Sequence, residues 1–156
     1  MKLIKWLLFA PIVLIGLGVL GTELNKAYWD SKVKALCEKE GGVTVFEKME
    51  ISISDYPDIK LSSNNQLIMP SERNAKPEDP FFYRYRMDYL HRGFVDVVRH
   101  EQSIIRGQDR KVLSTHISFG RGGGDFPTGF HPSHYSCKDR DENTRIYGST
   151  VIVKGE

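Results

Sequence analysis

The stretch GRGGGDFPTGFHPSHYSC, residues 120–137, gathers most of the residues in this sequence that could do chemistry. Its two histidines, His131 and His134, are separated by two residues, and Asp125 precedes them. Imidazole and carboxylate groups are ligands that zinc favours. These three residues are therefore a candidate metal site, although HPSH is not the HExxH helix motif of zinc proteases.

The glycines of the same stretch raise the alternative of a phosphate-binding loop. A P-loop needs a lysine and a hydroxyl residue directly after its last glycine, at the start of a helix. Here Gly124 is followed by Asp125, and an acidic residue repels phosphate. The glycines instead indicate a tight loop with positive φ angles. No Gly-x-Ser-x-Gly nucleophile motif occurs, so we assign no catalytic residue and no cofactor.

The N-terminus carries a hydrophobic segment. Lys2 and Lys5 precede Trp6–Thr22, a run of 17 residues without a charge, about 25 Å long as a helix. This length is close to the lower limit for crossing a bilayer, so residues 1–22 are predicted to be a membrane anchor. A cleavable signal peptide, with Val19-Leu20-Gly21 as its cleavage site, is the alternative. In both cases the lysines keep the N-terminus in the cytosol and the rest of the chain is exported.

Export makes the charge and the cysteines informative. Without Lys2 and Lys5, 20 basic residues balance 20 acidic ones, whereas a nucleic-acid-binding protein normally has a basic surface. No nucleic-acid partner is expected. In an oxidising compartment Cys37 and Cys137 are expected to form a disulfide, the alternative being two unrelated buried thiols.

Hydrophobic periodicity predicts an α+β fold. Residues 23–42 have the period of an amphipathic helix, which can continue the anchor as one long helix and ends at Gly41-Gly42. Residues 43–156 are predicted to form a single antiparallel sheet of four to five strands, with the Gly/Pro-rich loop at 120–137. The strands are expected at 43–54, 81–90, 94–105, 111–120 and 145–153, and RGQDR, residues 106–110, is predicted to be a hairpin turn.

One strand face is a candidate partner surface. In FFYRYRMDYL, residues 81–90, alternation places Tyr83 and Tyr85 on one face and Arg84 and Arg86 on the other. Aromatic residues and arginine are concentrated in interface hot spots. Alternation in an ordinary strand explains the same pattern more simply.

Three blocks of the sequence resemble a family of uncharacterised bacterial exported or membrane-anchored small proteins. They are LCEKEGGVTVFEKMEIS (36–52), AKPEDPFFYRYRMDYLHRG (75–93) and GRGGGDFPTGFHPSHYSC (120–137), about a third of the chain. The resemblance implies a compact envelope domain framed by its two cysteines, and it implies no activity, cofactor or catalytic residue. Similar sequences use Ser-Asp-Gly in the hairpin where this one has Gln108-Asp109-Arg110.

These observations favour a non-catalytic binding or assembly role in the bacterial envelope. The expected location is the inner membrane, with a single span, a cytoplasmic N-terminus and a periplasmic domain; secretion into the periplasm after cleavage is the alternative. The expected partners are the lipid bilayer, through the N-terminal helix, and another envelope protein. The alternative function is a small envelope enzyme or metal-binding protein that uses His131, His134 and Asp125.

Overall fold

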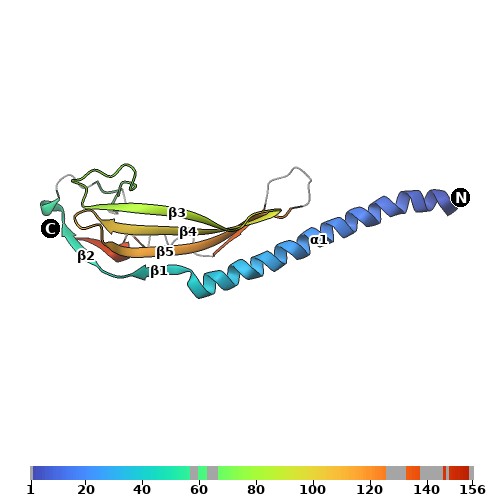
Figure 1. Cartoon of the computed structure of the whole chain (residues 1–156), viewed down its shortest axis with the longest axis horizontal. Coiled ribbons are helices and arrows are strands. Elements are labelled where there is room, and N and C mark those ends of the chain that lie inside the picture. Colours follow the sequence, from blue (N-terminus) through green and yellow to red (C-terminus); the bar gives the residue numbers. More distant parts are fainter. Residues whose placement is uncertain are drawn as a thin grey trace.

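The computed structural model describes residues 2–56, 60–62, 67–125, 133–137, 146 and 148–154; the side chains of residues 2–12, 55 and 154 lie outside the described part. One long helix, α1, runs from Lys2 to Glu40 and ends at the two glycines that follow it. Its C-terminal half lies along the sheet, and its N-terminal half projects beyond it (Figure 1). The prediction that the N-terminal hydrophobic segment and the amphipathic segment form one continuous helix is confirmed.

The fold is α+β, with the helix packed on an antiparallel sheet of five strands, as expected. In the sheet β1, β5, β4 and β3 follow one another, and β6 pairs with β5 beside β1. A separate two-stranded sheet joins β2 and β7. The strands are β1 (Gly42–Val45), β2 (Met49–Ser52), β3 (Phe81–His91), β4 (Val95–Arg106), β5 (Val112–Gly123), β6 (His134–Ser136) and β7 (Val151–Lys154), with a 3₁₀ turn at Ile53–Asp55.

The strand expected across residues 43–54 is wrong, because it is two strands in different sheets. Glu47, the only break in the apolar row, lies at the point of separation. The N–H groups of Phe46 and Glu47 both donate to the carbonyl of Leu113, at 2.8 and 3.1 Å, which ends β1. The Glu47 carboxylate then binds Arg106 and Lys111 at 2.6 and 2.5 Å. The chain leaves the sheet here, and β2 pairs elsewhere.

The single antiparallel sheet is also corrected at the C-terminus. Residue 146 and residues 148–150 are helical rather than extended, and only β7 follows as a strand. The hydroxyl of Thr150 donates to the carbonyl of Ile146 at 2.6 Å, a bond typical of helical geometry. β7 then pairs in parallel with β2, from Met49 opposite Val151.

Two hydrophobic clusters lie at opposite ends of the sheet. One is formed by Val33 of α1 with Val95, Val97 and Phe119 of the sheet, all at most 2% exposed. The other connects the sheet to β2, β7 and the 60–70 connection, and its buried members are Ile51, Leu67, Met69, Phe81, Ile104, Leu113, Ile146 and Val151. Because the clusters use different ends, the helix covers only the part of the sheet nearest the β3–β4 hairpin.

The described part of α1 before the sheet is apolar and uncovered. Its large hydrophobic side chains are between 39% and 68% exposed: Val13, Leu14, Ile15, Leu17, Val19, Leu20 and Leu24. In the part of the chain that the structure describes, no helix combines the length and the apolar character that a membrane span requires. The predicted anchor, residues 1–22, includes residues 1–12, whose side chains lie outside the described part.

Candidate functional site

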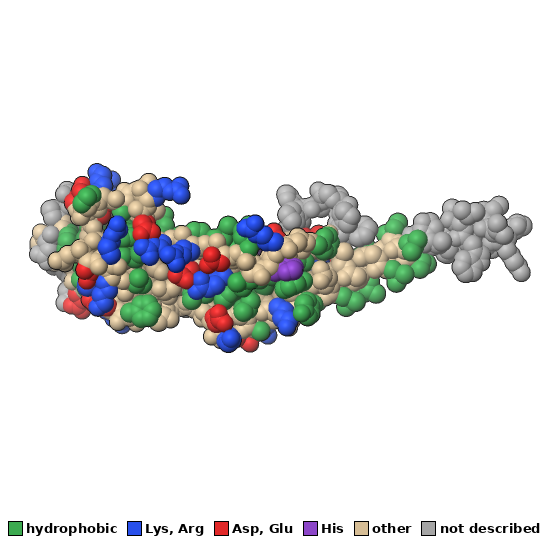
Figure 2. All heavy atoms as spheres, viewed as in Figure 1, with side chains coloured by type: hydrophobic (Ala, Val, Ile, Leu, Met, Phe, Trp, Pro, Cys, Tyr) green, Lys and Arg blue, Asp and Glu red, His purple; other side chains and the backbone are tan. Residues whose placement is uncertain are grey.

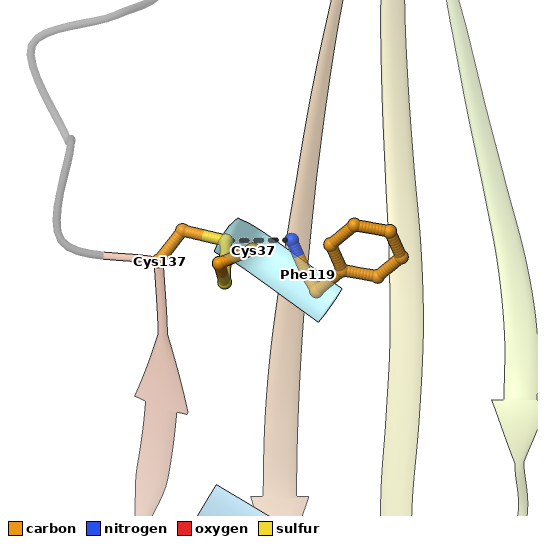
Figure 3. The surroundings of a disulfide bond; sticks show 3 residues. All are labelled: Cys37, Phe119 and Cys137. Carbon is orange, nitrogen blue, oxygen red and sulfur yellow. Dashed lines mark hydrogen bonds between the residues drawn. A yellow bond between two sulfur atoms is a disulfide. The ribbon is translucent and has the colours of Figure 1, made fainter. Parts of the chain in front are cut away.

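The two cysteines are joined in a disulfide, as the sequence predicted. Cys37 and Cys137 are 100 residues apart in the chain, and their Cα atoms are 5.7 Å apart. The backbone N–H of Phe119 donates to the sulfur of Cys137 at 3.2 Å (Figure 3). The bond therefore joins the last turn of α1 to the chain end of β6, directly beside β5.

The disulfide lies at a break between two edge strands. β1 and β6 share one edge of β5, because Gly42 lies opposite Ile117 and Ser136 lies opposite Gly120. Between these pairs, the N–H of Cys137 donates to the carbonyl of Phe119 at 3.1 Å. The disulfide thus closes the edge of the sheet at the point where the helix ends.

The glycines at the end of β5 allow a close approach of the helix and the hairpin. Gly123 and Gly124 have φ angles of 76° and 86°. A Cβ atom on Gly124 would lie 2.8 Å from Cγ2 of Val95 and 3.1 Å from Cγ of Lys26. β5 continues to Gly123, so the glycines that suggested a phosphate loop belong partly to a strand. Their role in the structure is to permit packing that a side chain would block.

Of the three proposed metal ligands, Asp125 is held by neighbouring groups in the fold. Its carboxylate accepts a hydrogen bond from the backbone N–H of Ser133 at 2.6 Å and binds the ammonium group of Lys26 at 3.1 Å. The hydrogen bond from Ser133 and the pairing with Lys26 lower the pKa of Asp125 to about 2. His134 is exposed at the start of β6, and His131 lies outside the described residues. Within the described residues, no group of three His, Cys, Asp or Glu side chains could hold a metal ion. The metal site stays a prediction.

An ion pair between α1 and the sheet, in addition to the disulfide, was not predicted. Arg121 on β5 has a side chain only 3% exposed, and its Nε donates to Asp30 of α1 at 2.5 Å. Its Nη1 donates to the carbonyl of Gly123 and to the hydroxyl of Ser133, at 2.5 and 3.1 Å. A buried charge needs such partners, because desolvation without them is costly. The sequence gives no signal for this pairing, since the residues are 91 positions apart.

Of the four residues in the candidate partner surface on β3, two are held by contacts within the fold and two are exposed. Tyr83 packs against the larger hydrophobic cluster. The guanidinium of Arg84 donates two hydrogen bonds to the carboxylate of Glu72, at 2.7 and 2.5 Å, and this pairing lowers the pKa of Glu72. Tyr85, by contrast, is 54% exposed, and Arg86 is exposed as well.

β3 is the terminal strand of the sheet, and its outer edge is paired only at its start. The N–H of Tyr83 donates to the carbonyl of Pro70 at 3.0 Å, and its carbonyl accepts from Glu72 at 2.7 Å. Backbone groups of alternate residues in a strand point the same way, so those of Tyr85, Met87 and Tyr89 also face outward. Among the described residues, no strand pairs with this part of the edge.

The side chains along this edge are exposed and apolar: Tyr85 by 54%, Met87 by 48% and Tyr89 by 41%. An open hollow of about 840 Å³ begins beside them, where the turn Ser71–Asn74 leaves the edge next to Tyr85 and Gln102. We call the unpaired part of the strand, Tyr85–Tyr89, the β3 edge; the hollow adjoins it at Tyr85.

A tyrosine–histidine pair on the same strand face is a further feature that the sequence did not reveal. The register places Tyr85 opposite Gln102 and Met87 opposite His100. The Tyr85 hydroxyl lies 2.5 Å from Nδ1 of His100, and burial lowers the pKa of that histidine. The two rings are also stacked, with centroids 5.9 Å apart, and these contacts hold Tyr85 against the sheet.

Comparison with family models, curated proteins and solved structures finds no match for this chain. The resemblance to uncharacterised envelope proteins therefore stays a prediction.

Proposed function

We propose that this protein is an envelope protein anchored in the bacterial inner membrane, whose periplasmic domain binds a segment of another envelope protein without catalysis. The observation that carries the proposal is the apolar half of α1, which projects uncovered from a disulfide-bonded domain (Figures 1 and 2). Figure 2 shows hydrophobic side chains on the helix beyond the end of the sheet.

A bilayer is the covering that suits this helix. The run Trp6–Thr22 has no charge, and its described members from Val13 onward are exposed on successive residues rather than along one stripe. A helix that is apolar all round is stable in a membrane or a protein core, not in water. The disulfide supports placement of the domain on the oxidising side of the membrane.

The β3 edge supports a binding role. It offers outward N–H and C=O groups at Tyr85, Met87 and Tyr89, together with exposed side chains that a partner can cover. An extended peptide that adds to such an edge gains affinity from the main chain and specificity from alternate side chains. Ser71 already pairs with Tyr83 in parallel at the start of this edge. The added segment continues that pairing along the strand.

The test is photocrosslinking in intact bacteria, with the probe amino acid at Tyr89. We expect one crosslinked protein species. Met87→Pro should abolish this crosslink, because proline removes the outward N–H and leaves the pairing with β4 intact. The matched control carries the probe at exposed Thr44 on β1, at the opposite edge of the sheet. Recovery of only the monomer, or a crosslink that survives Met87→Pro, contradicts strand addition at β3.

A further inference from the structure

The turn between β3 and β4 is unusual for a hairpin exposed to water. Together with the last two residues of β3 it has the sequence LHRGF, residues 90–94, and we call this segment the hairpin tip. Leu90 is 50% exposed and Phe94 is 60% exposed. Hairpin turns are normally formed by polar residues and glycine, and two large apolar side chains at a tip indicate a surface that something covers.

The exposure of these side chains is imposed by a fixed backbone. The carbonyl of Phe94 accepts a hydrogen bond from the N–H of Gly124 at 2.9 Å. The N–H of Gly93 donates to the carboxylate of Asp96 at 3.1 Å. On the other side of the turn, His91 stacks on Trp29 of α1 with ring centroids 4.4 Å apart. The backbone of the tip is thus tied to both helix and sheet.

The tip lies beside the part of α1 that directly follows the proposed anchor. Gly124, which bonds to Phe94, lies against Lys26, four residues after the last residue of the uncharged run, Thr22. At a rise of about 1.5 Å per residue, four residues are about 6 Å. The headgroup layer on each side of a bilayer core is about 5–7 Å thick. With Thr22 at the edge of the hydrocarbon, the tip lies at headgroup depth.

The residues around the tip have the chemistry of a membrane interface. On the neighbouring turns of α1, Leu24 is 64% exposed and Tyr28 is 55% exposed. The guanidinium of Arg92 lies 3.9 Å from the ring centre of Tyr89. Aromatic rings and basic groups that extend from an apolar surface are favoured at headgroup level.

We propose that the hairpin tip rests in the headgroup layer of the same bilayer that holds α1, with Phe94 and Leu90 inserted between the lipids. This inference rests on the proposed anchor and adds a second contact to it. A single helix leaves the domain free to tilt about the point where it leaves the membrane. Contact at the tip fixes the orientation, with β2 and β7, at the opposite end of the sheet, held away from the surface (Figure 1).

The experiment measures quenching of tryptophan by brominated lipids. The full chain is reconstituted in vesicles of phosphatidylethanolamine and phosphatidylglycerol, with bromine near the headgroup end of the acyl chains. Phe94→Trp is compared with Phe46→Trp, both in a Trp6→Phe background. Phe46 is the matched control, because it is 63% exposed and lies between β1 and β2, away from the tip.

We expect the brominated lipid to remove at least half of the emission added by Trp at position 94, and none of that added at position 46. Equal quenching at the two positions overturns the proposal. The anchor is tested separately by flotation with the vesicles and by the quenching of native Trp6. Flotation with quenched Trp6 but unquenched Trp at position 94 overturns the tip contact alone. Failure to float overturns the anchor, and the inference with it.

Discussion

Removal of the Cys37–Cys137 disulfide is expected to destabilise the domain by about 5–6 kcal/mol. The perturbation is Cys37→Ala with Cys137→Ala. The bond spans 100 residues, and in the chain-entropy model closure of such a loop contributes about 4.7 kcal/mol. Loss of the sulfur also deprives the N–H of Phe119 of its acceptor, which costs about 1 kcal/mol more.

Urea unfolding of the full chain in detergent micelles measures this loss. Trp29 is the reporter, because its stack on His91 breaks when the helix leaves the sheet. Trp6→Phe removes the only other tryptophan from the signal. With a urea m-value of about 2 kcal/mol per molar, a loss of about 5–6 kcal/mol lowers the unfolding midpoint by more than 2 M.

Reductant provides the internal control for this prediction. Dithiothreitol should lower the midpoint of the parent protein to within about 0.5 M of the double variant, since reduced Cys137 keeps its sulfur, and should leave the variant unchanged. A midpoint difference below about 0.5 M, roughly 1 kcal/mol, would refute the loop-closure reasoning. It would mean that the unfolded chain is already restrained, or that the bond is strained enough to cancel its benefit.

Two further predictions concern the end of β5. Gly124→Ala places a Cβ 2.8 Å from Val95 at a φ of 86°, so we expect a loss of about 2–4 kcal/mol by urea unfolding. Gly122→Ala, with no atom within 4 Å of its Cβ, should change stability by less than about 0.5 kcal/mol; equal losses would contradict the packing argument. Because the pKa of Asp125 is lowered to about 2 from 3.8, its contribution is complete above pH 5 and is lost as pH falls through 2. Asp125→Asn should therefore lower the urea midpoint at pH 7 and not at pH 2, and an equal effect at both values would show that the charge of Asp125 is irrelevant.

The elements governed by local periodicity could be predicted from the sequence. β3 formed where the sequence alternates, although its burial does not: its first two residues are buried and residues 85–91 are exposed. The hairpin at residues 106–110 formed where turn residues separate two apolar runs. Arg110 there has a φ of 60°, which suits the glycine that similar sequences are expected to have. The disulfide followed from compartment and cysteine number rather than from geometry.

Pairing between distant elements could not be predicted, because alternation is the same for every partner a strand can have. The pattern of residues 49–52 is compatible with continuing β1, yet β2 pairs in parallel with β7. At the point where the two strands separate, Glu47 pairs with Arg106 and Lys111, which are far away in the sequence. At residue 146 and residues 148–150, which are helical within a β-prone segment, the hydroxyl of Thr150 donates to the carbonyl of Ile146.

The candidate surface on β3 also combines a feature that the sequence predicted with one that it did not. Alternation placed Tyr83 and Tyr85 on one face, but strand order made β3 the open edge. Tyr83 is part of the core, whereas Tyr85 is exposed, because the connection around Ser71 covers only the start of the strand. Which residues are available to a partner is thus decided by a neighbouring segment that the sequence pattern does not place.

The proposed anchor restricts the kind of partner that can add a strand to the β3 edge. A second copy that pairs in antiparallel fashion about Met87 would place Arg86 opposite Asp88 twice, and such exposed ion pairs contribute at most about 1 kcal/mol each. However, this pairing reverses the strand direction, and α1 projects along the strands (Figure 1). The two anchors would then point in opposite directions, and one bilayer could not hold both. Withdrawing one anchor exposes ten Leu, Ile, Phe and Val residues of Trp6–Thr22, about 3–6 kcal/mol on an insertion scale. This loss exceeds the gain from the ion pairs, so the proposed anchor disfavours an antiparallel second copy as the strand added to β3.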